Sequence, residues 1–199
     1  LWGVLKEYFF ENKKESETTY FLFGQFTNQN KCLLMMLEKF MKDLIMLNKR
    51  FQEDNGSITN AMEMCKNIFI KFSNILLLEN KRSLSLNSRL ALLHLETSID
   101  GDKTIVFDIL GINTKSLKEL CSYFIDRYGE SVPLSTLNQE ELLNLTKILR
   151  NYIITCLEKM KKHYPYSDIF FEKISVLEPN HFKQSYLLDL RKRFPKVNI

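Results

Sequence analysis

The chain has 199 residues, a mass of 23.6 kDa and a hydrophobic content of 45%, which is typical of a packed globular domain and argues against a disordered one. Its 6 glycines and 4 prolines are few for this length, so we expect few turns and long elements, which favours helices. The formal charge is only +4, from 28 Lys+Arg against 24 Asp+Glu. A protein that binds polyanions through its whole-molecule field is therefore not indicated, and any nucleic-acid contact has to come from a local patch.

The cysteines and histidines have no metal-ligand spacing, because no CxxC or CxxH motif occurs. They are Cys32, Cys65, Cys121, Cys156, His94, His163 and His181. We interpret the cysteines as core thiols of an intracellular protein. No apolar run approaches the ~20 residues of a membrane span, and no signal-peptide pattern opens the chain at Leu1, which predicts a location in the cytosol or nucleus.

The N-terminal part predicts a first helical element from about Leu1 to Phe10 and a solvated loop at Glu11 to Thr18. A long helix follows from about Asn30, because apolar residues recur at alternating spacings of four and three, as in a helix seam. These are Leu33, Leu37, Phe40, Leu44, Leu47 and Phe51.

The turn EDNG, ending at Gly56, separates this helix from a second one with the same rhythm, and Ser57 suits its N-cap. The second seam contains Ile58, Met62, Cys65, Phe69, Phe72 and Leu76. Two such helices joined by a short turn predict an antiparallel hairpin over Asn30 to Leu78. We expect its interior to include Leu37, Phe40, Leu44, Phe51, Cys65, Phe69 and Phe72.

The pattern weakens between about Glu79 and Gly111, where a short helix is expected at Arg89 to Leu95. The run Thr104 to Leu110 (TIVFDIL) is either a strand or a buried helical turn, since periodicity does not separate the two.

The C-terminal half predicts four further helices. The first is capped by Asn113 or Thr114 and ends at Gly129. The second starts at a capping box formed by Asn138 and Glu141 and ends at Tyr164, before Pro165. The last two span Ser167 to Val176 and His181 to Phe194. The predicted fold is all-α, an irregular bundle of long antiparallel helices. We expect one domain, 1–199, which could be divided into sub-bundles 1–80 and 104–199 around an irregular segment 81–103.

No catalytic group or cofactor site is predicted in this chain. The sequence DGD around Asp100 and Asp102, with Asp108 nearby, lacks the further oxygen ligands and closing Glu of a calcium loop, so we interpret it as a solvated turn. No nucleophile motif surrounds a serine, and no glycine-rich loop is present to hold a phosphate.

Two basic runs are the candidate DNA-binding residues. They are Lys159, Lys161 and Lys162, and Arg191, Lys192, Arg193 and Lys196. Cations at helix C-termini also interact favourably with the helix dipole, so both a structural role and a phosphate contact remain open. Tyr164, beside the first run, could stack on a base, although core packing is the commoner use of an aromatic ring. Trp2, the single tryptophan, suits an anchor of the first helix.

Three sequence segments resemble the helical region of hAT-superfamily transposases and their domesticated relatives. They are LKEYF at Leu5 to Phe9, NKRFQ at Asn48 to Gln52 and LRKRFP at Leu190 to Pro195. The likeness spans most of the chain except about Glu79 to Lys103.

The resemblance implies an all-helical insertion domain that interrupts an RNase H-like core, whose two aspartates and one glutamate have no counterpart in this chain. It further implies a nuclear protein that assembles with protein partners or with itself and can contact the DNA backbone, without a membrane or small-molecule substrate. Trp2 and Tyr164 are the candidates for the base-stacking role of the family's insertion, although no motif locates that role in this chain. Two alternatives stay open: a fragment of an active DNA transposase whose catalytic core lies outside this chain, and a helical adaptor that binds a partner in an apolar groove. Whether the parent protein is an enzyme is therefore left open.

Overall fold

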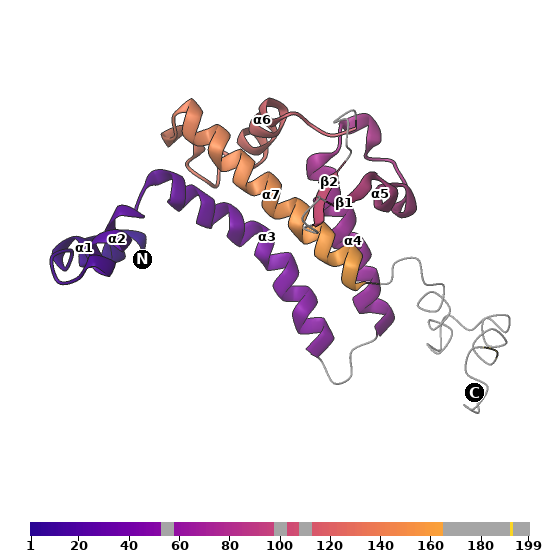
Figure 1. The fold of residues 1–199 in the computed structure, drawn as a ribbon, viewed down its shortest axis with the longest axis horizontal. Coiled ribbons are helices and arrows are strands. Elements are labelled where there is room, and N and C mark those ends of the chain that lie inside the picture. Colours follow the sequence, from indigo (N-terminus) through magenta and orange to yellow (C-terminus); the bar gives the residue numbers. More distant parts are fainter. Residues whose placement is uncertain (53–57, 98–102, 108–112, 165–191, 193–199) are drawn as a thin grey trace. The chain divides into compact units, whose positions relative to one another are not determined.

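The computed structural model describes residues 1–52, 58–97, 103–107, 113–164 and 192. Seven α-helices lie in this described part, so the all-α class is confirmed, and one two-stranded hairpin accompanies them (Figure 1). The chain forms two compact units, and each unit draws on two separate stretches of sequence. The long helices α3 (Asn28–Gln52) and α7 (Gln139–His163) each contribute residues to both.

The first unit comprises Leu1–Lys42 and Lys115–Tyr152. Besides the first parts of α3 and α7, it contains α1 (Trp2–Glu11), α2 (Glu17–Gly24), α6 (Leu117–Tyr128) and the 3-10 turn η2 (Leu134–Thr136). In its core the Phe40 ring of α3 lies 6.1 Å from that of Tyr128 and 6.4 Å from that of Tyr152. Its other buried residues include Cys32, Met36, Leu120, Cys121, Phe124, Val132, Leu134, Leu145 and Leu149.

Reciprocal side-chain caps fix the starts of α6 and α7. The predicted box at α7 is confirmed, since the amide of Glu141 donates to Asn138 Oδ1 at 2.9 Å and the amide of Asn138 donates to Glu141 Oε2 at 2.9 Å. The cap predicted for α6 at Asn113 or Thr114 is wrong. Ser116 caps that helix with Glu119 as its partner, because only this pair satisfies two free amides at once.

The second unit comprises Asp43–Thr114 and Ile153–Ile199. It contains α4 (Ile58–Leu76), η1 (Glu79–Lys81), α5 (Leu86–Leu92), β1 (Leu93–Thr97) and β2 (Lys103–Phe107), with the later parts of α3 and α7. Lys71 of α4 donates to Asp43 of α3 at 2.6 Å, and both residues lie more than two helical turns from the connection between the helices, as expected for an antiparallel arrangement. Its buried residues include Leu47, Met62, Cys65, Ile68, Phe69, Phe72, Ile75, Leu76, Ile153, Leu157 and Met160.

The segment after α4 contains the departure from helical structure. The helix expected at Arg89 to Leu95 instead spans Leu86–Leu92, and the chain continues directly into β1. Strand β1 pairs antiparallel with β2, with Leu95 opposite Ile105, so the described part of the TIVFDIL run is a strand. A strand satisfies its backbone by pairing, which sequence periodicity alone does not reveal.

The expected seams of α3 and α4 are confirmed in part. Of the residues expected in the interior, Phe40, Cys65, Phe69 and Phe72 are buried. Leu37 and Leu44 are only half-buried, and Phe51 is 44% exposed, so the burial predicted for these three is wrong. The face of α3 that is buried runs through Cys32, Met36, Phe40 and Leu47, because the helix is rotated relative to the predicted seam.

Several expectations lie outside the described residues. They are the turn with Asp100, Asp102 and Asp108, and the helices expected over 167–176 and 181–194, of which only Lys192 is described. None of the helices in the described part of the chain is long and apolar enough to cross a membrane.

Candidate protein-interaction site

The first 26 residues form a helical hairpin, called here the N-terminal hairpin, which consists of α1, α2 and the following turn to Phe26. Its interior is made of aromatic rings. Phe26 lies 4.8 Å from the ring of Trp2 and 5.5 Å from that of Phe9, measured between centroids. Trp2 is therefore the anchor of the first helix that the sequence suggested, and it is half-buried in this cluster.

A second cluster holds the other side of the N-terminal hairpin together. The rings of Phe10 and Phe23 are 5.5 Å apart, and the Lys13 ammonium lies 4.0 Å from the first ring and 5.5 Å from the second. A cation over aromatic faces is attracted by the ring quadrupole. Ser16 starts α2 by accepting a hydrogen bond from the amide of Thr19 at 3.1 Å.

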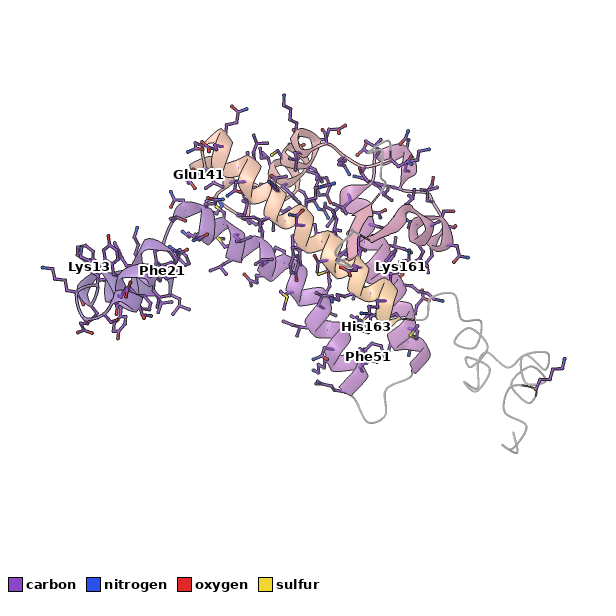
Figure 2. All side chains as sticks on the ribbon, viewed as in Figure 1. Lys13, Phe21, Phe51, Glu141, Lys161 and His163 are labelled. Atoms are coloured by element: carbon purple, nitrogen blue, oxygen red, sulfur yellow. The ribbon has the colours of Figure 1, made fainter. Side chains whose placement is uncertain are left out.

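The outer surface of the N-terminal hairpin is unusually apolar. Neither α1 nor α2 contains a buried residue. Four aromatic side chains are more than half exposed: Tyr8 at 56%, Phe10 at 53%, Tyr20 at 67% and Phe21 at 63%. Leu1, Val4, Leu5 and Leu22 are exposed as well. Figure 2 shows the side chains of this hairpin, with Lys13 and Phe21 labelled. Single exposed apolar side chains are ordinary, but a concentration of them marks an interaction surface.

Sequence reasoning missed this hairpin surface, although a signal was present. Eight of the 24 aromatic residues of the chain (15 Phe, 8 Tyr and 1 Trp) fall within its first 26 residues. These are Trp2, Tyr8, Phe9, Phe10, Tyr20, Phe21, Phe23 and Phe26. Two helices of ten and eight residues cannot bury so many rings between them, so the composition alone indicates exposed aromatic groups.

The first basic run lies on the last turns of α7, and its three lysines differ in environment. Lys159 and Lys162 are exposed and three residues apart, so they share one side of the helix. Lys161 is half-buried, and its Nζ donates to the carbonyl oxygen of Leu90 in α5 at 2.8 Å (Figure 2). Burial lowers the pKa of Lys161. This lysine has a structural role, whereas the other two can reach a ligand.

The second basic run is described only at Lys192, which is exposed. Arg191, Arg193 and Lys196 lie outside the described residues, so the structure does not bring the two runs together or separate them.

Tyr164, the other candidate for base stacking, is engaged within the protein. Its ring stacks on Phe51 at 5.8 Å between centroids and 19° between planes. Burial raises the pKa of the Tyr164 hydroxyl to about 12, with further contributions from the nearby Cys65 thiol and its hydrogen bond. The pKa of Cys65 is raised to about 11, chiefly because the thiol is buried. The geometry of Tyr164 is therefore that of a packing residue just after α7.

A buried arginine joins α5 to α4. Arg89 is 1% exposed, and its Nη1 donates to Ser73 Oγ and Asn74 Oδ1, each at 2.7 Å. Its Nε donates to the carbonyl of Leu84 at 2.8 Å, and its Nη2 donates to that of Arg82. These four acceptors are neutral, so the guanidinium is held by hydrogen bonds, and burial lowers its pKa. This arrangement stabilises the fold.

A shallow cavity of about 430 Å³ is lined by residues of α3 and α4, among them the apolar Met64 and Ile68. Its lining also carries both signs of charge, from Asp43, Arg50, Glu63 and Lys71. Two of these lining residues, Asp43 and Lys71, form an ion pair with each other.

The side chains that the structure describes contain no group of three or more His, Cys, Asp or Glu residues that could hold a metal ion. The four cysteines are free thiols, three of them buried. A comparison with protein-family models, with curated proteins and with solved structures found no significant match. The function has therefore to be argued from the surface of this chain.

Proposed function

We propose that this chain is a protein-interaction domain that binds its partner through the exposed aromatic surface of the N-terminal hairpin. The hAT resemblance extends this proposal: the chain is then the helical insertion of a transposase-derived nuclear protein. The observation that supports the interaction role is the exposure of Tyr8, Phe10, Tyr20 and Phe21 on two short helices without a buried residue.

The physical argument is the cost of this surface. Each apolar Å² in contact with water costs on the order of 25 cal/mol, so the exposed rings gain free energy when a partner covers them. Tyrosine and phenylalanine are also suited to binding because few side-chain torsions are frozen when they are covered. Interface centres are enriched in such rings.

The test compares proteins captured from nuclear extract by three versions of the chain. One is unchanged, and one carries Tyr20→Gln and Phe21→Gln, which remove two exposed rings that lie on α2. The third carries Ile45→Gln and Met46→Gln on α3, which remove similar exposed apolar surface, at 60% and 53%, from outside the N-terminal hairpin. We expect a set of proteins that the unchanged chain and the α3 variant capture and the hairpin variant loses.

Equal capture of the same proteins by all three versions would contradict the proposal. Circular dichroism of each variant is the control for folding. Glutamine is a good helix former, so the helical signal should not change.

A second proposed activity is contact with the DNA backbone, which the exposure of Lys159 and Lys162 on one side of α7 favours. Such binding is electrostatic and indifferent to sequence, so the affinity should fall steeply between about 50 mM and 200 mM salt. The variant Lys159→Glu with Lys162→Glu should abolish DNA binding. The variant Lys39→Glu with Lys42→Glu on α3 alters the net charge by the same amount at another place, so it is the matched control and should bind more tightly than the first variant. Fluorescence anisotropy of a labelled duplex measures both. Equal affinities of the two variants would remove this activity.

A further inference from the structure

The charges beside the exposed aromatic side chains of the N-terminal hairpin are of both signs and nearly balanced. The positive groups are Lys6, Lys13 and Lys14, and the negative ones are Glu7, Glu11, Glu15 and Glu17. A partner surface of a single sign would meet repulsion from one of these sets. Two copies related by a two-fold axis avoid this, because the carboxylates of each copy can pair with the ammonium groups of the other.

We propose that the N-terminal hairpin docks onto the N-terminal hairpin of a second copy, so that the chain self-associates through it. This inference rests on the proposed function and names its partner.

The exposed apolar surface of the N-terminal hairpin can supply the area that such a contact needs. An aromatic side chain buries about 150–250 Å² when it is fully covered. The four exposed rings have 53–67% of their surface in solvent. Tyr8 and Phe10 are two residues apart on α1 and point to different sides of that helix, so at most three of the four rings share one face, on the order of 350 Å² per copy. A standard stable interface needs about 800 Å² per partner, so the exposed aliphatic side chains of the hairpin have to supply a comparable share.

The charged groups are placed so that they can act as fixed partners. Glu7 and Glu11 are both exposed and lie one turn apart on α1. Lys13 is held over the rings of Phe10 and Phe23, so less side-chain entropy is lost when it meets a carboxylate. Lys14, next to it, is exposed.

The first experiment is sedimentation equilibrium of the purified 199-residue chain from about 1 to 200 μM, which spans the affinities of weak homodimers. We expect a reversible monomer–dimer equilibrium. The variant Tyr20→Gln with Phe21→Gln should weaken it at least about tenfold, since exposed rings at the centre of an interface contribute most of its affinity. The matched variant Ile45→Gln with Met46→Gln should dimerise like the unchanged chain.

The second experiment exchanges charges between copies. Glu7→Lys with Glu11→Lys, and separately Lys6→Glu with Lys14→Glu, should each weaken self-association because like charges then face each other. An equimolar mixture of the two variants should form a mixed dimer with an affinity near that of the unchanged chain. If the mixture recovers the affinity, both variants are folded and each one alone had lost only its charge complementarity.

A chain that stays monomeric throughout this concentration range overturns the inference, as does equal weakening by the α3 variant or failure of the mixture to recover. If the chain is monomeric while the hairpin variant still loses proteins in the capture experiment, the interaction role stands and only the second copy is excluded. If neither measurement depends on the hairpin, both proposals fall.

Discussion

At the scale of single residues, Arg89 is a buried charged side chain that joins α5 to α4. It hydrogen-bonds to Ser73 and Asn74 of α4 and to the backbone carbonyls of Leu84 and Arg82. A guanidinium is a suitable group for this position because its donors form a planar fork that reaches several acceptors at once.

We predict that Arg89→Ala lowers the free energy of unfolding by roughly 3 kcal/mol or more, because each hydrogen bond from a charged donor contributes about 1.5–3 kcal/mol and the buried hydroxyl of Ser73 would lose this partner. Urea denaturation measures this. Lys81→Ala, in the nearby η1, is the matched control and should change stability by about 0.5 kcal/mol or less. A small effect of Arg89→Ala would mean that water can replace the guanidinium.

The buried thiol of Cys65, which lies beside the half-buried Tyr164, makes stability depend on alkaline pH. Burial raises the pKa of Cys65 from its ordinary value of 9.0 to about 11. A raised pKa favours the neutral thiol in the folded state, so this contribution is complete below pH 9 and is lost as the pH rises towards 11.

We therefore predict that the free energy of unfolding falls between about pH 9 and pH 11, and that Cys65→Ala makes this fall shallower. Urea titrations at a series of pH values test the slope. Cys156→Ala, at a less buried position on α7, serves as the control. A slope unchanged by Cys65→Ala would show that the thiol does not ionise in this range.

At the scale of elements, α3 shows what periodicity determines and what it leaves open. The pattern predicted a long helix here, which is confirmed, but it selected the face through Leu33, Leu37 and Leu44. The turn EDNG expected after it, with Ser57 as the next cap, lies outside the described residues. The buried face is rotated towards Cys32 and Met36. This helix has apolar side chains on several sides, including exposed Leu34, Met41 and Ile45, so more than one seam fits the sequence and tertiary packing decides between them.

A pair of substitutions on α3 tests this face. Met36→Ala removes a fully buried side chain and should cost roughly 2–5 kcal/mol. Leu34→Ala, two residues away, removes a side chain that is 55% exposed and should change the free energy of unfolding by about 0.5 kcal/mol or less. Thermal or urea denaturation measures both. If the two variants lose similar amounts of unfolding free energy, the buried face of α3 is assigned wrongly.

Other elements were predictable to different degrees. The capping box at Asn138 and Glu141 follows from local chemistry, so the sequence predicts it correctly. The strands β1 and β2 depend on pairing between two separate segments, which periodicity within either segment does not show. The helix Leu86–Leu92 starts three residues earlier than expected, because Ser85 caps it by accepting a hydrogen bond from the amide of Ser88 at 3.2 Å. The burial of Arg89 could not be predicted, because charged residues are rarely buried and their partners are not visible in a sequence.

At the scale of the whole molecule, both units are assembled from two separate stretches of the chain. The sequence suggested consecutive sub-bundles, since it shows where a pattern weakens but not which distant helices pack together. The N-terminal hairpin belongs to the first unit, yet its helices contribute no buried residue. Few buried apolar contacts mean low local stability.

We predict that amides of α1 and α2 exchange with solvent by local opening, much faster than those of α4, whose buried face includes Phe69 and Phe72. Native-state hydrogen exchange with mass spectrometry measures the difference. Raising the protein concentration should slow exchange in the hairpin if a second copy covers it, while α4 serves as an internal reference. Equal protection of the hairpin and α4 at low concentration would contradict this prediction.

The position of Trp2 gives the molecule a natural optical reporter. It is the one tryptophan of the chain, and its indole packs against Phe26 inside the N-terminal hairpin. Selective excitation of the indole therefore reports the state of this hairpin alone, whereas far-ultraviolet dichroism is dominated by the longer helices. A blue shift of the emission on mixing would signal that water has left the hairpin, and an emission change that precedes the loss of helical signal on heating would show it opening first. Docking and local melting can thus be followed in the unlabelled protein.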